Sequence, residues 1–242
     1  MPTFTAHTLA KPPDLFCILL STVLLFWSGD ATTASRSGQD WTRAIVKIEV
    51  PIVRRIEGYP RHFLERCSAT IVSPGPRPLL ISAWHCFEGH DALGSPATLL
   101  TDSGPIALEL VASGGSMKHD WAVLRATVGW APHTWIPIAP VRAKRGSRIS
   151  AAGFSRSLAP DFNAAANHED RSLIIDPDCR VTAAGPPPLA SSCVIQRGAS
   201  GGAILGRTQS GGLRVFGIIS AGDSETVSYF YPTDLLSSRV WP

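Results

Sequence analysis

Gly198-Ala199-Ser200-Gly201-Gly202 is the stretch of this sequence that decides between fold classes. Glycines around a serine allow a sharp turn, so that the hydroxyl stands clear and neighbouring N–H groups point at a bound carbonyl. A nucleophilic serine needs this arrangement. Two other interpretations exist, because the pattern is also that of the nucleophile elbow of α/β hydrolases and because glycine-rich serine turns occur in linkers without chemistry.

The positions of the histidines separate these alternatives. In α/β hydrolases the serine is followed by an acid and then by a histidine, but no histidine follows Ser200 here. The base must therefore precede the serine, as in the order His, Asp, Ser. An order that begins with an acid such as Asp40 belongs to a parallel-sheet fold, and no helical patterns separate the strands of this chain. The seven histidines are His7, His62, His85, His90, His119, His133 and His168.

Composition indicates a globular chain with many turns and an unremarkable surface charge. The 242 residues are 44% hydrophobic and 17% charged, with 21 Gly and 20 Pro, which is enough for a sizeable core. The net charge is only +3, and no run of Lys and Arg exceeds two residues. We therefore expect no nucleic-acid or membrane surface, and nothing in the sequence indicates a cofactor.

Residues 1–34 have the features of a secretory signal peptide. A polar start with Lys11 precedes an apolar run at 15–27, and small residues follow at 31–34. The run is shorter than the roughly 20 residues of a membrane-spanning helix, although an uncleaved anchor is the alternative. We expect cleavage near Ala31 or Ala34, a mature chain over 35–242 without stable membrane association, and a secreted or periplasmic location.

Cleavage would also remove Cys17 and leave an even number of cysteines. In an exported chain this predicts two disulfides. Each would close a short loop and stabilise the fold by about 3 kcal/mol. Four cysteines allow three disulfide connectivities. We favour the one in which each cysteine pairs with its neighbour along the chain. A metal site is the alternative, but there is no C-x-x-C spacing and His85 beside Cys86 is not a zinc motif. The favoured pairs are Cys67 with Cys86 and Cys179 with Cys193.

The mature chain has the pattern of successive strands. In residues 44–50, apolar Val46, Ile48 and Val50 alternate with polar residues, as in a half-buried strand. Many short strands with Gly and Pro turns predict an all-β fold of antiparallel barrels or sandwiches. Further strands are expected at 67–73, 79–82, 97–101, 106–112, 121–126, 148–154, 173–176, 180–183, 203–205, 213–220 and 227–231, with a connection at 137–146 and a short helix at 233–239.

Three motifs resemble those of the chymotrypsin/trypsin-like serine proteases. Residues 81–86 (ISAWHC) are similar to the histidine motif of that family, 120–124 (DWAVL) to its aspartate motif and 198–202 to its serine motif, in the family's order. Residues 220–222 (SAG) stand where the family has Ser-aromatic-Gly. The resemblance covers about 41–236 and implies two six-stranded antiparallel β-barrels, over about 41–136 and 147–236, with the active site in the cleft between them.

The resemblance also implies a catalytic triad of His85, Asp120 and Ser200. Ser200 would attack the scissile carbonyl, His85 would take its proton and return it to the leaving amine, and Asp120 would orient the imidazole. The backbone N–H groups of Gly198 and Ser200 would form the oxyanion hole. The implied activity is that of a secreted, monomeric serine endopeptidase acting on proteins or peptides.

Each of these residues has a structural alternative. His85 could be a buried histidine next to a disulfide. Asp91 and Asp102 compete with Asp120, but Asp102 precedes Ser-Gly-Pro and is typical of a turn. His90 is expected in an exposed loop, and His119 should point away from its neighbour Asp120 on an extended chain.

Two departures from the family pattern affect activation and specificity. Ala199 replaces the aspartate that, in trypsin-like zymogens, pairs with a freed N-terminus, so activation by that route is not expected. In this the chain is more similar to bacterial members such as the glutamyl endopeptidases. No carboxylate stands where trypsin selects Arg or Lys, and Ile219 replaces the histidine of the glutamyl enzymes, so a small or apolar residue is expected in the primary pocket. The resemblance places Val194, Ile195, Gln196, Ser220, Ala221 and Gly222 around that pocket.

Two other functions remain open at this point. A catalytically silent, protease-shaped binding protein would keep the barrels, but such proteins usually lose a triad residue. An esterase on the same fold would share the acyl-transfer chemistry.

Overall fold

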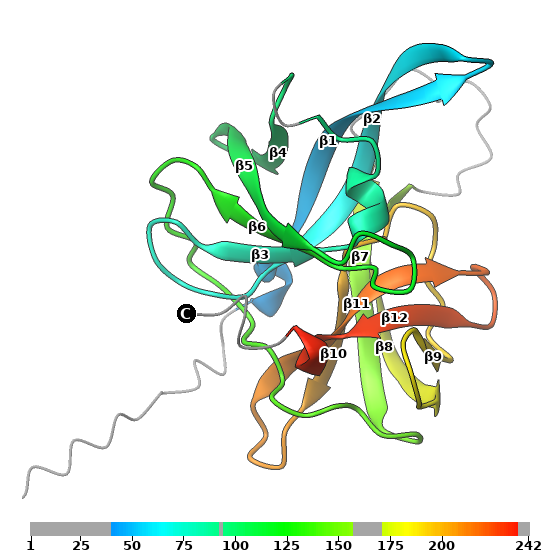
Figure 1. The fold of residues 1–242 in the computed structure, drawn as a ribbon. Helices are drawn as coiled ribbons and strands as arrows, with labels where there is room; N and C mark the ends of the chain where they lie inside the picture. Colours follow the sequence, from blue (N-terminus) through cyan, green and yellow to red (C-terminus); the bar gives the residue numbers. More distant parts are fainter. Residues whose placement is uncertain (1–39, 92–93, 157–170, 237–242) are drawn as a thin grey trace, which may run out of the picture. The chain divides into compact units, whose positions relative to one another are not determined.

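Two closed antiparallel β-barrels form the described part of the chain in the computed structural model (Figure 1). The structure describes residues 40–91, 94–156 and 171–236, which all belong to one unit, Arg36–Pro242. The predicted signal peptide at 1–34 lies outside the described residues, and so do residues 237–239 of the predicted closing helix. None of the described helices is both long and apolar enough to cross a membrane.

The first barrel closes in the order β1-β2-β3-β6-β5-β4. The predicted alternation of residues 44–50 is realised in β1, where Ile48 and Val50 are buried. A short 3-10 helix, η1 (Trp41–Ala44), precedes it and is capped by the Asp40 side chain, which accepts a hydrogen bond from the Thr42 N–H. The strands are β1 (Ile45–Ile56), β2 (Tyr59–Ile71), β3 (Leu79–Ser82), β4 (Ala97–Thr101), β5 (Gly104–Ser113) and β6 (Ala122–Ala126).

The second barrel closes in the order β10-β11-β12-β9-β8-β7. It ends in a single 3-10 turn, η4 (Thr233–Leu235), where a short helix was expected. Its strands are β7 (Arg148–Arg156), β8 (Arg171–Ala183), β9 (Leu189–Ser191), β10 (Ala203–Arg207), β11 (Leu213–Gly222) and β12 (Ser228–Pro232). The predicted pair of six-stranded antiparallel barrels is confirmed.

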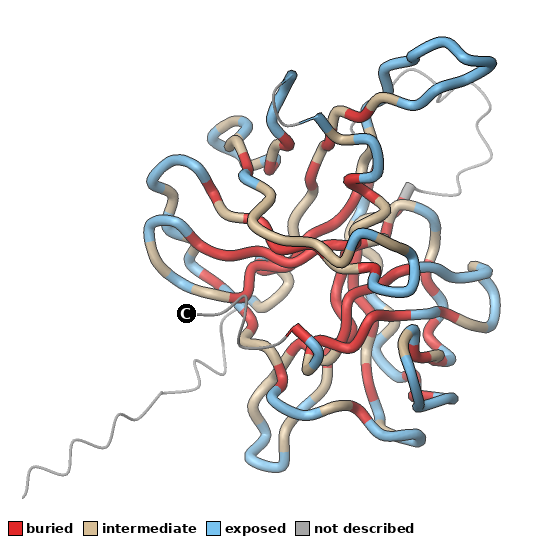
Figure 2. Tube along the Cα trace, in the orientation of Figure 1, coloured by how far each residue is buried: buried red, intermediate tan, exposed pale blue. Residues whose placement is uncertain are grey.

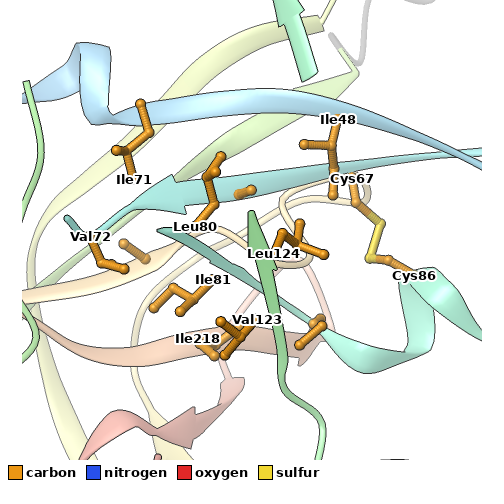
Figure 3. Close-up of a cluster of buried hydrophobic side chains, with 14 of the residues drawn as sticks. Ile48, Cys67, Ile71, Val72, Leu80, Ile81, Cys86, Val123, Leu124 and Ile218 are labelled. Carbon is orange, nitrogen blue, oxygen red and sulfur yellow. A yellow bond between two sulfur atoms is a disulfide. The ribbon is translucent and has the colours of Figure 1, made fainter. Parts of the chain in front are cut away.

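A shared apolar core joins the two barrels. Ile48, Leu80 and Leu124 fill the first barrel, and Ile218 of β11 lies in the same cluster beside Val123 (Figure 3). Burying an aliphatic side chain of this size stabilises the fold by about 1.5–3 kcal/mol relative to exposure. Figure 2 shows buried residues running continuously along the strands that face the junction. The junction is therefore part of the packed interior.

The β1–β2 hairpin is longer than the sequence pattern predicts. Pairing continues to Ile56 opposite Tyr59, whereas strands were expected only at 44–50 and 67–73. The distal half is exposed on both faces, as the pale-blue tube at the upper right of Figure 2 shows. A strand with no buried face has no alternation of apolar and polar residues, so the pattern carries no signal there.

The second barrel differs from expectation at β8 and β9. The strands predicted at 173–176 and 180–183 form one strand, and Pro177 sits where the register slips, between the pairs Ile149 with Cys179 and Ala151 with Asp176. Proline has no N–H to donate, and a bulge is one of the few places in a strand that tolerates it. The strand β9 was missed because it has only three residues and follows a run of three prolines.

Candidate active site

His85 is delivered by a fully buried strand. All four residues of β3 are buried, and the chain then turns into a 3-10 helix, η2 (Trp84–Phe87), which carries His85. The next residue, Cys86, is bonded to Cys67 of β2, and the second disulfide joins Cys179 to Cys193. These are the two local pairs favoured from the sequence. The Cys67 link fixes the base of η2 to the wall of the first barrel.

Asp120 lies two residues before β6 and is only 1% exposed. Its carboxylate accepts from the His85 backbone N–H at 2.9 Å and lies 2.8 Å from His85 Nδ1. An ionised carboxylate can only accept, so we assign the ring proton to Nδ1, which leaves Nε2 as the basic nitrogen. The Ser220 hydroxyl of β11 also donates to Asp120. Burial of this carboxylate is thus compensated by three donors.

Ser220 has a role that the sequence analysis did not find. It was placed among the substrate-binding residues, and it does line the pocket, but its side chain reaches Asp120 from the other barrel. No spacing between positions 120 and 220 in the sequence indicates this contact. It depends on the docking of β11 against the first barrel.

The loop that presents Ser200 requires glycine at both ends. Gly198 has φ +97° and Gly201 has φ +82°, in the left-handed region that favours glycine. A Cβ on Gly201 would lie 2.1 Å from the Ser68 carbonyl oxygen, a clash that excludes any residue with a side chain. The local sequence therefore specifies this turn, and Ser200 remains partly exposed between the two glycines.

Backbone donors in this loop divide into satisfied and unsatisfied groups. The Ala199 N–H donates to Gln196 O at 3.2 Å, and the Gly201 N–H donates to Ile219 O at 2.8 Å. In the part of the chain that the structure describes, the N–H groups of Gly198 and Ser200 have no hydrogen-bond acceptor. These are the two groups predicted to bind an oxyanion, and a pair of free N–H groups beside a serine hydroxyl suits that task.

His85 and Ser200 both line one cavity of about 360 Å³ between the barrels. No hydrogen bond joins the Ser200 hydroxyl to the His85 ring among the described residues. Nucleophile and base are often loosely aligned in a ligand-free enzyme and tighten when substrate binds. The structure therefore brings His85 and Asp120 into contact and places Ser200 on the same cavity.

Five of the six residues predicted to bind substrate line this cavity. Val194 is the exception: it is 40% exposed, and its backbone N–H donates to Asp176 Oδ2 at 2.7 Å. That bond turns the start of the loop toward β8 and away from the cavity. Five lining residues were not among those predicted. Arg54 and Met117 come from a hairpin and a loop that only the fold brings close. The other three, Glu88, Arg197 and Ile219, lie within three residues of the predicted His85, Gln196 and Ser220.

The turn after the cavity wall is organised by Asp223. The Thr226 hydroxyl and the backbone N–H groups of Val227, Thr226 and Glu225 donate to its carboxylate. These bonds favour the ionised form and hold the pKa of Asp223 well below its usual range. The β11–β12 turn that follows Gly222 is thereby fixed by a single side chain.

The competing acids and histidines of the sequence analysis lie at exposed positions, except for His90. Asp102 is exposed in the β4–β5 turn, and Asp91 and His119 are exposed. His90 is not simply exposed loop: it is half-buried, and its Nδ1 lies 2.8 Å from Pro51 O. A backbone bridge to Ile52 holds it against the hairpin.

The one group of potential metal ligands among the described residues consists of Cys67, His85 and Cys86, with ligand atoms within 4.8 Å of one another. The two sulfur atoms are bonded to each other. A disulfide offers no thiolate to a metal ion, so this group does not fit a zinc site.

Comparisons with known proteins agree on the fold. No protein-family profile and no curated protein sequence matches the chain. Among solved structures it is similar to the inactive form of the Rv3671c protease of M. tuberculosis (TM-score 0.54, 15% identity, 84% of this chain and 91% of that chain). It is also similar to the active form of that protease (TM-score 0.55, 17% identity, 79% and 77%) and to a serine endoprotease from Yersinia pestis (TM-score 0.53, 20% identity, 81% and 60%). The chain therefore has the double-barrel fold of the trypsin-like serine proteases; the finer resemblance to glutamyl endopeptidases stays a prediction.

Proposed function

We propose that the protein is a serine endopeptidase that cleaves peptide bonds through an acyl-enzyme, with Ser200 as nucleophile, His85 as general base and acid, and Asp120 as the group that orients His85. The observation that carries the proposal is the contact of buried Asp120 with both the ring and the backbone of His85, across a cavity from Ser200. A buried carboxylate that holds the ring and the backbone of a histidine at the edge of a cavity suits the task of orienting a general base.

The proposed reaction follows from the donors and acceptors at the site. His85 Nε2 takes the Ser200 proton as the hydroxyl oxygen attacks the substrate carbonyl. The Gly198 and Ser200 N–H groups bind the developing oxyanion, and each such donor is worth about 3 kcal/mol in the transition state. The imidazolium, stabilised by Asp120, then protonates the leaving amine. Water then attacks the carbonyl carbon of the acyl-enzyme while His85 takes its proton. The bond to the Ser200 oxygen breaks, His85 returns the proton to that oxygen, and the acid leaves.

The cavity favours a small or apolar side chain on the acyl side of the scissile bond. Ile195, Ile219, Ala221 and Gly222 supply its apolar wall, and no Asp or Glu lies on that wall to pair with a basic substrate residue. The charged lining residues, Arg54, Glu88 and Arg197, are of both signs and lie at exposed positions. A peptide library with strict cleavage after Arg or Glu would overturn this assignment.

We place the mature enzyme over residues 35–242, outside the cytoplasm and monomeric, with the two halves at about 41–136 and 147–236. The two disulfides support an oxidising compartment, because such bonds persist mainly in exported proteins. The signal-peptide pattern of residues 1–34 points to the same location.

The test is covalent labelling of the purified mature protein with a fluorophosphonate probe, followed by mass spectrometry. We expect labelling at Ser200 that is lost in Ser200→Ala and in His85→Ala. His119→Ala is the matched control, because it removes an exposed histidine next to Asp120 and should label normally. A folded protein that is not labelled would favour the silent binding protein, and turnover of esters without peptides would favour the esterase.

A further inference from the structure

Among the described residues, no ion pair holds the loop that carries the predicted oxyanion donors. Position 199 is Ala, which is 2% exposed and packs closely on Gly153 of β7. A Cβ added at Gly153 would lie 2.8 Å from the Ala199 carbonyl oxygen. No salt bridge involves residues 196–200 in the part of the chain that the structure describes. Some other interaction must fix the orientation of the Gly198 peptide.

Ser155 of β7 holds the peptide that contains the Gly198 N–H. Its side chain is fully buried, and its hydroxyl donates to Arg197 O at 3.0 Å, with Gln196 Oε1 as a second acceptor at 3.2 Å. The Arg197 carbonyl and the Gly198 N–H belong to one planar trans peptide and point in opposite directions. Anchoring the carbonyl oxygen toward β7 therefore fixes the direction of the Gly198 N–H, which points away from β7.

Ser68 of β2 holds the same loop from the first barrel. Its hydroxyl donates to Gly198 O at 3.2 Å and accepts from the Phe154 N–H at 2.8 Å, and its backbone N–H donates to Ser200 O at 2.8 Å. Ser68 is itself fully buried, and the Ser82 hydroxyl donates to its carbonyl oxygen at 2.8 Å. The loop is thus held on both sides of Gly198 by neutral hydroxyl groups.

We propose that Ser155 and Ser68 are positioning residues that keep the oxyanion loop assembled by neutral hydrogen bonds, so that the site is active without a freed N-terminus. The proposal rests on the proposed function. It assigns to two buried serines, one from each barrel, the task that a charged pair at position 199 would otherwise perform. Neutral bonds of this kind do not depend on a proteolytic cut, so the assembled loop is the resting state of the folded enzyme.

The test separates transition-state binding from ground-state binding. For Ser155→Ala we expect kcat per labelled site to fall roughly 10- to 100-fold, less than the loss of a whole donor, with little change in KM. The inhibition constant of a peptide aldehyde, whose adduct carries an oxyanion, should rise by the same factor. Ser155→Thr keeps the hydroxyl and should recover most of the activity, and Ser68→Ala should resemble Ser155→Ala.

Ser150→Ala is the matched control for Ser155→Ala. Ser150 lies on the same strand, and its hydroxyl also donates to a backbone carbonyl, Pro177 O at 2.9 Å, but away from the oxyanion loop. It should leave kcat and aldehyde affinity unchanged. Normalising to fluorophosphonate-labelled sites removes any contribution from unfolded protein.

The outcomes distinguish this proposal from the proposed function. An unlabelled wild-type protein would overturn the proposed function itself. An active wild type whose Ser155→Ala and Ser68→Ala variants keep kcat and aldehyde affinity would overturn only the positioning role. A protein with extra residues ahead of position 35 should be as active as the trimmed one, and activity that appears only after cleavage there would contradict the proposal.

Discussion

Asp120 contacts His85 at two points, the ring Nδ1 at 2.8 Å and the backbone N–H at 2.9 Å. One contact fixes the orientation of the ring, and the other fixes the chain that carries it. Because Asp120 is almost completely buried, both contacts are shielded from water and are stronger than they would be at the surface. The geometry of the base is therefore determined by one side chain.

Asp120→Asn should nearly abolish turnover while the fold remains. The amide presents only one acceptor oxygen to the backbone and ring of His85, and its NH₂ favours the wrong imidazole tautomer, so we expect kcat to fall by about 10⁴-fold. Steady-state kinetics on a peptide anilide measures this. Asp102→Asn, in the exposed β4–β5 turn, is the control and should be as active as the wild type. Normal turnover of Asp120→Asn would remove Asp120 from the mechanism.

Gly222→Ala should narrow the substrate cavity. A Cβ at this position would lie 3.1 Å from Ile195 Cγ1 and 3.2 Å from Val227 O, so the methyl group takes space on the cavity wall. We expect kcat/KM for a peptide with Phe before the scissile bond to fall by about tenfold or more, and that for the matching Ala peptide to change little. An equal loss for both peptides would indicate that this wall does not contact the substrate side chain.

The two disulfides should contribute about equally to stability, but only one of them should affect catalysis. They close separations of 19 and 14 residues, so removing either by paired Cys→Ala changes should lower the free energy of unfolding by about 3 kcal/mol. Only the loss of Cys67–Cys86 should also lower kcat, since Cys86 adjoins His85 in η2. Chemical denaturation and active-site-titrated kinetics measure the two effects. Similar kcat losses for both pairs would contradict this.

Asp223 should make stability depend on pH in the acid range. Its folded pKa is lowered, so its stabilising bonds count fully above the unfolded value of about 3.9 and are lost as the pH falls below it. The difference in melting temperature between the wild type and Asp223→Ala should therefore be largest near neutral pH and shrink toward pH values of about 2 to 3. Thermal unfolding followed by circular dichroism tests this, and a constant difference would contradict it.

Most strands with at least one buried face were predictable from the sequence. The fully buried β3 and the alternating start of β1 matched their patterns, and β4 was predicted with its observed bounds, 97–101. The outer half of the β1–β2 hairpin was not, because its residues are exposed on both sides and its length is set by pairing alone. Pro177 divided β8 in the pattern, while the bulge opposite Ser150 keeps the strand whole.

The catalytic candidates were predictable because each is marked locally, beside a strand end or between glycines. The rest of the site was not. Arg54 reaches the cavity from the hairpin, and Met117 from the loop before β6, and neither has a motif around it. The resemblance placed Val194 at the pocket, but Val194 does not line the cavity, and its backbone N–H donates to Asp176 of β8. Buried hydroxyls such as Ser155 carry no signal at all, because serine is also common at the surface.

The Ser220 hydroxyl that donates to Asp120 crosses from one barrel to the other. The Asp120 carboxylate of the first half thus accepts a hydrogen bond from the second half, and the cavity is lined by His85 of the first half and Ser200 of the second. The proposed activity therefore depends on the docking of the two halves, each of which closes its own sheet. We expect any ligand that separates the halves by the length of one hydrogen bond to abolish the proposed activity while both barrels remain folded.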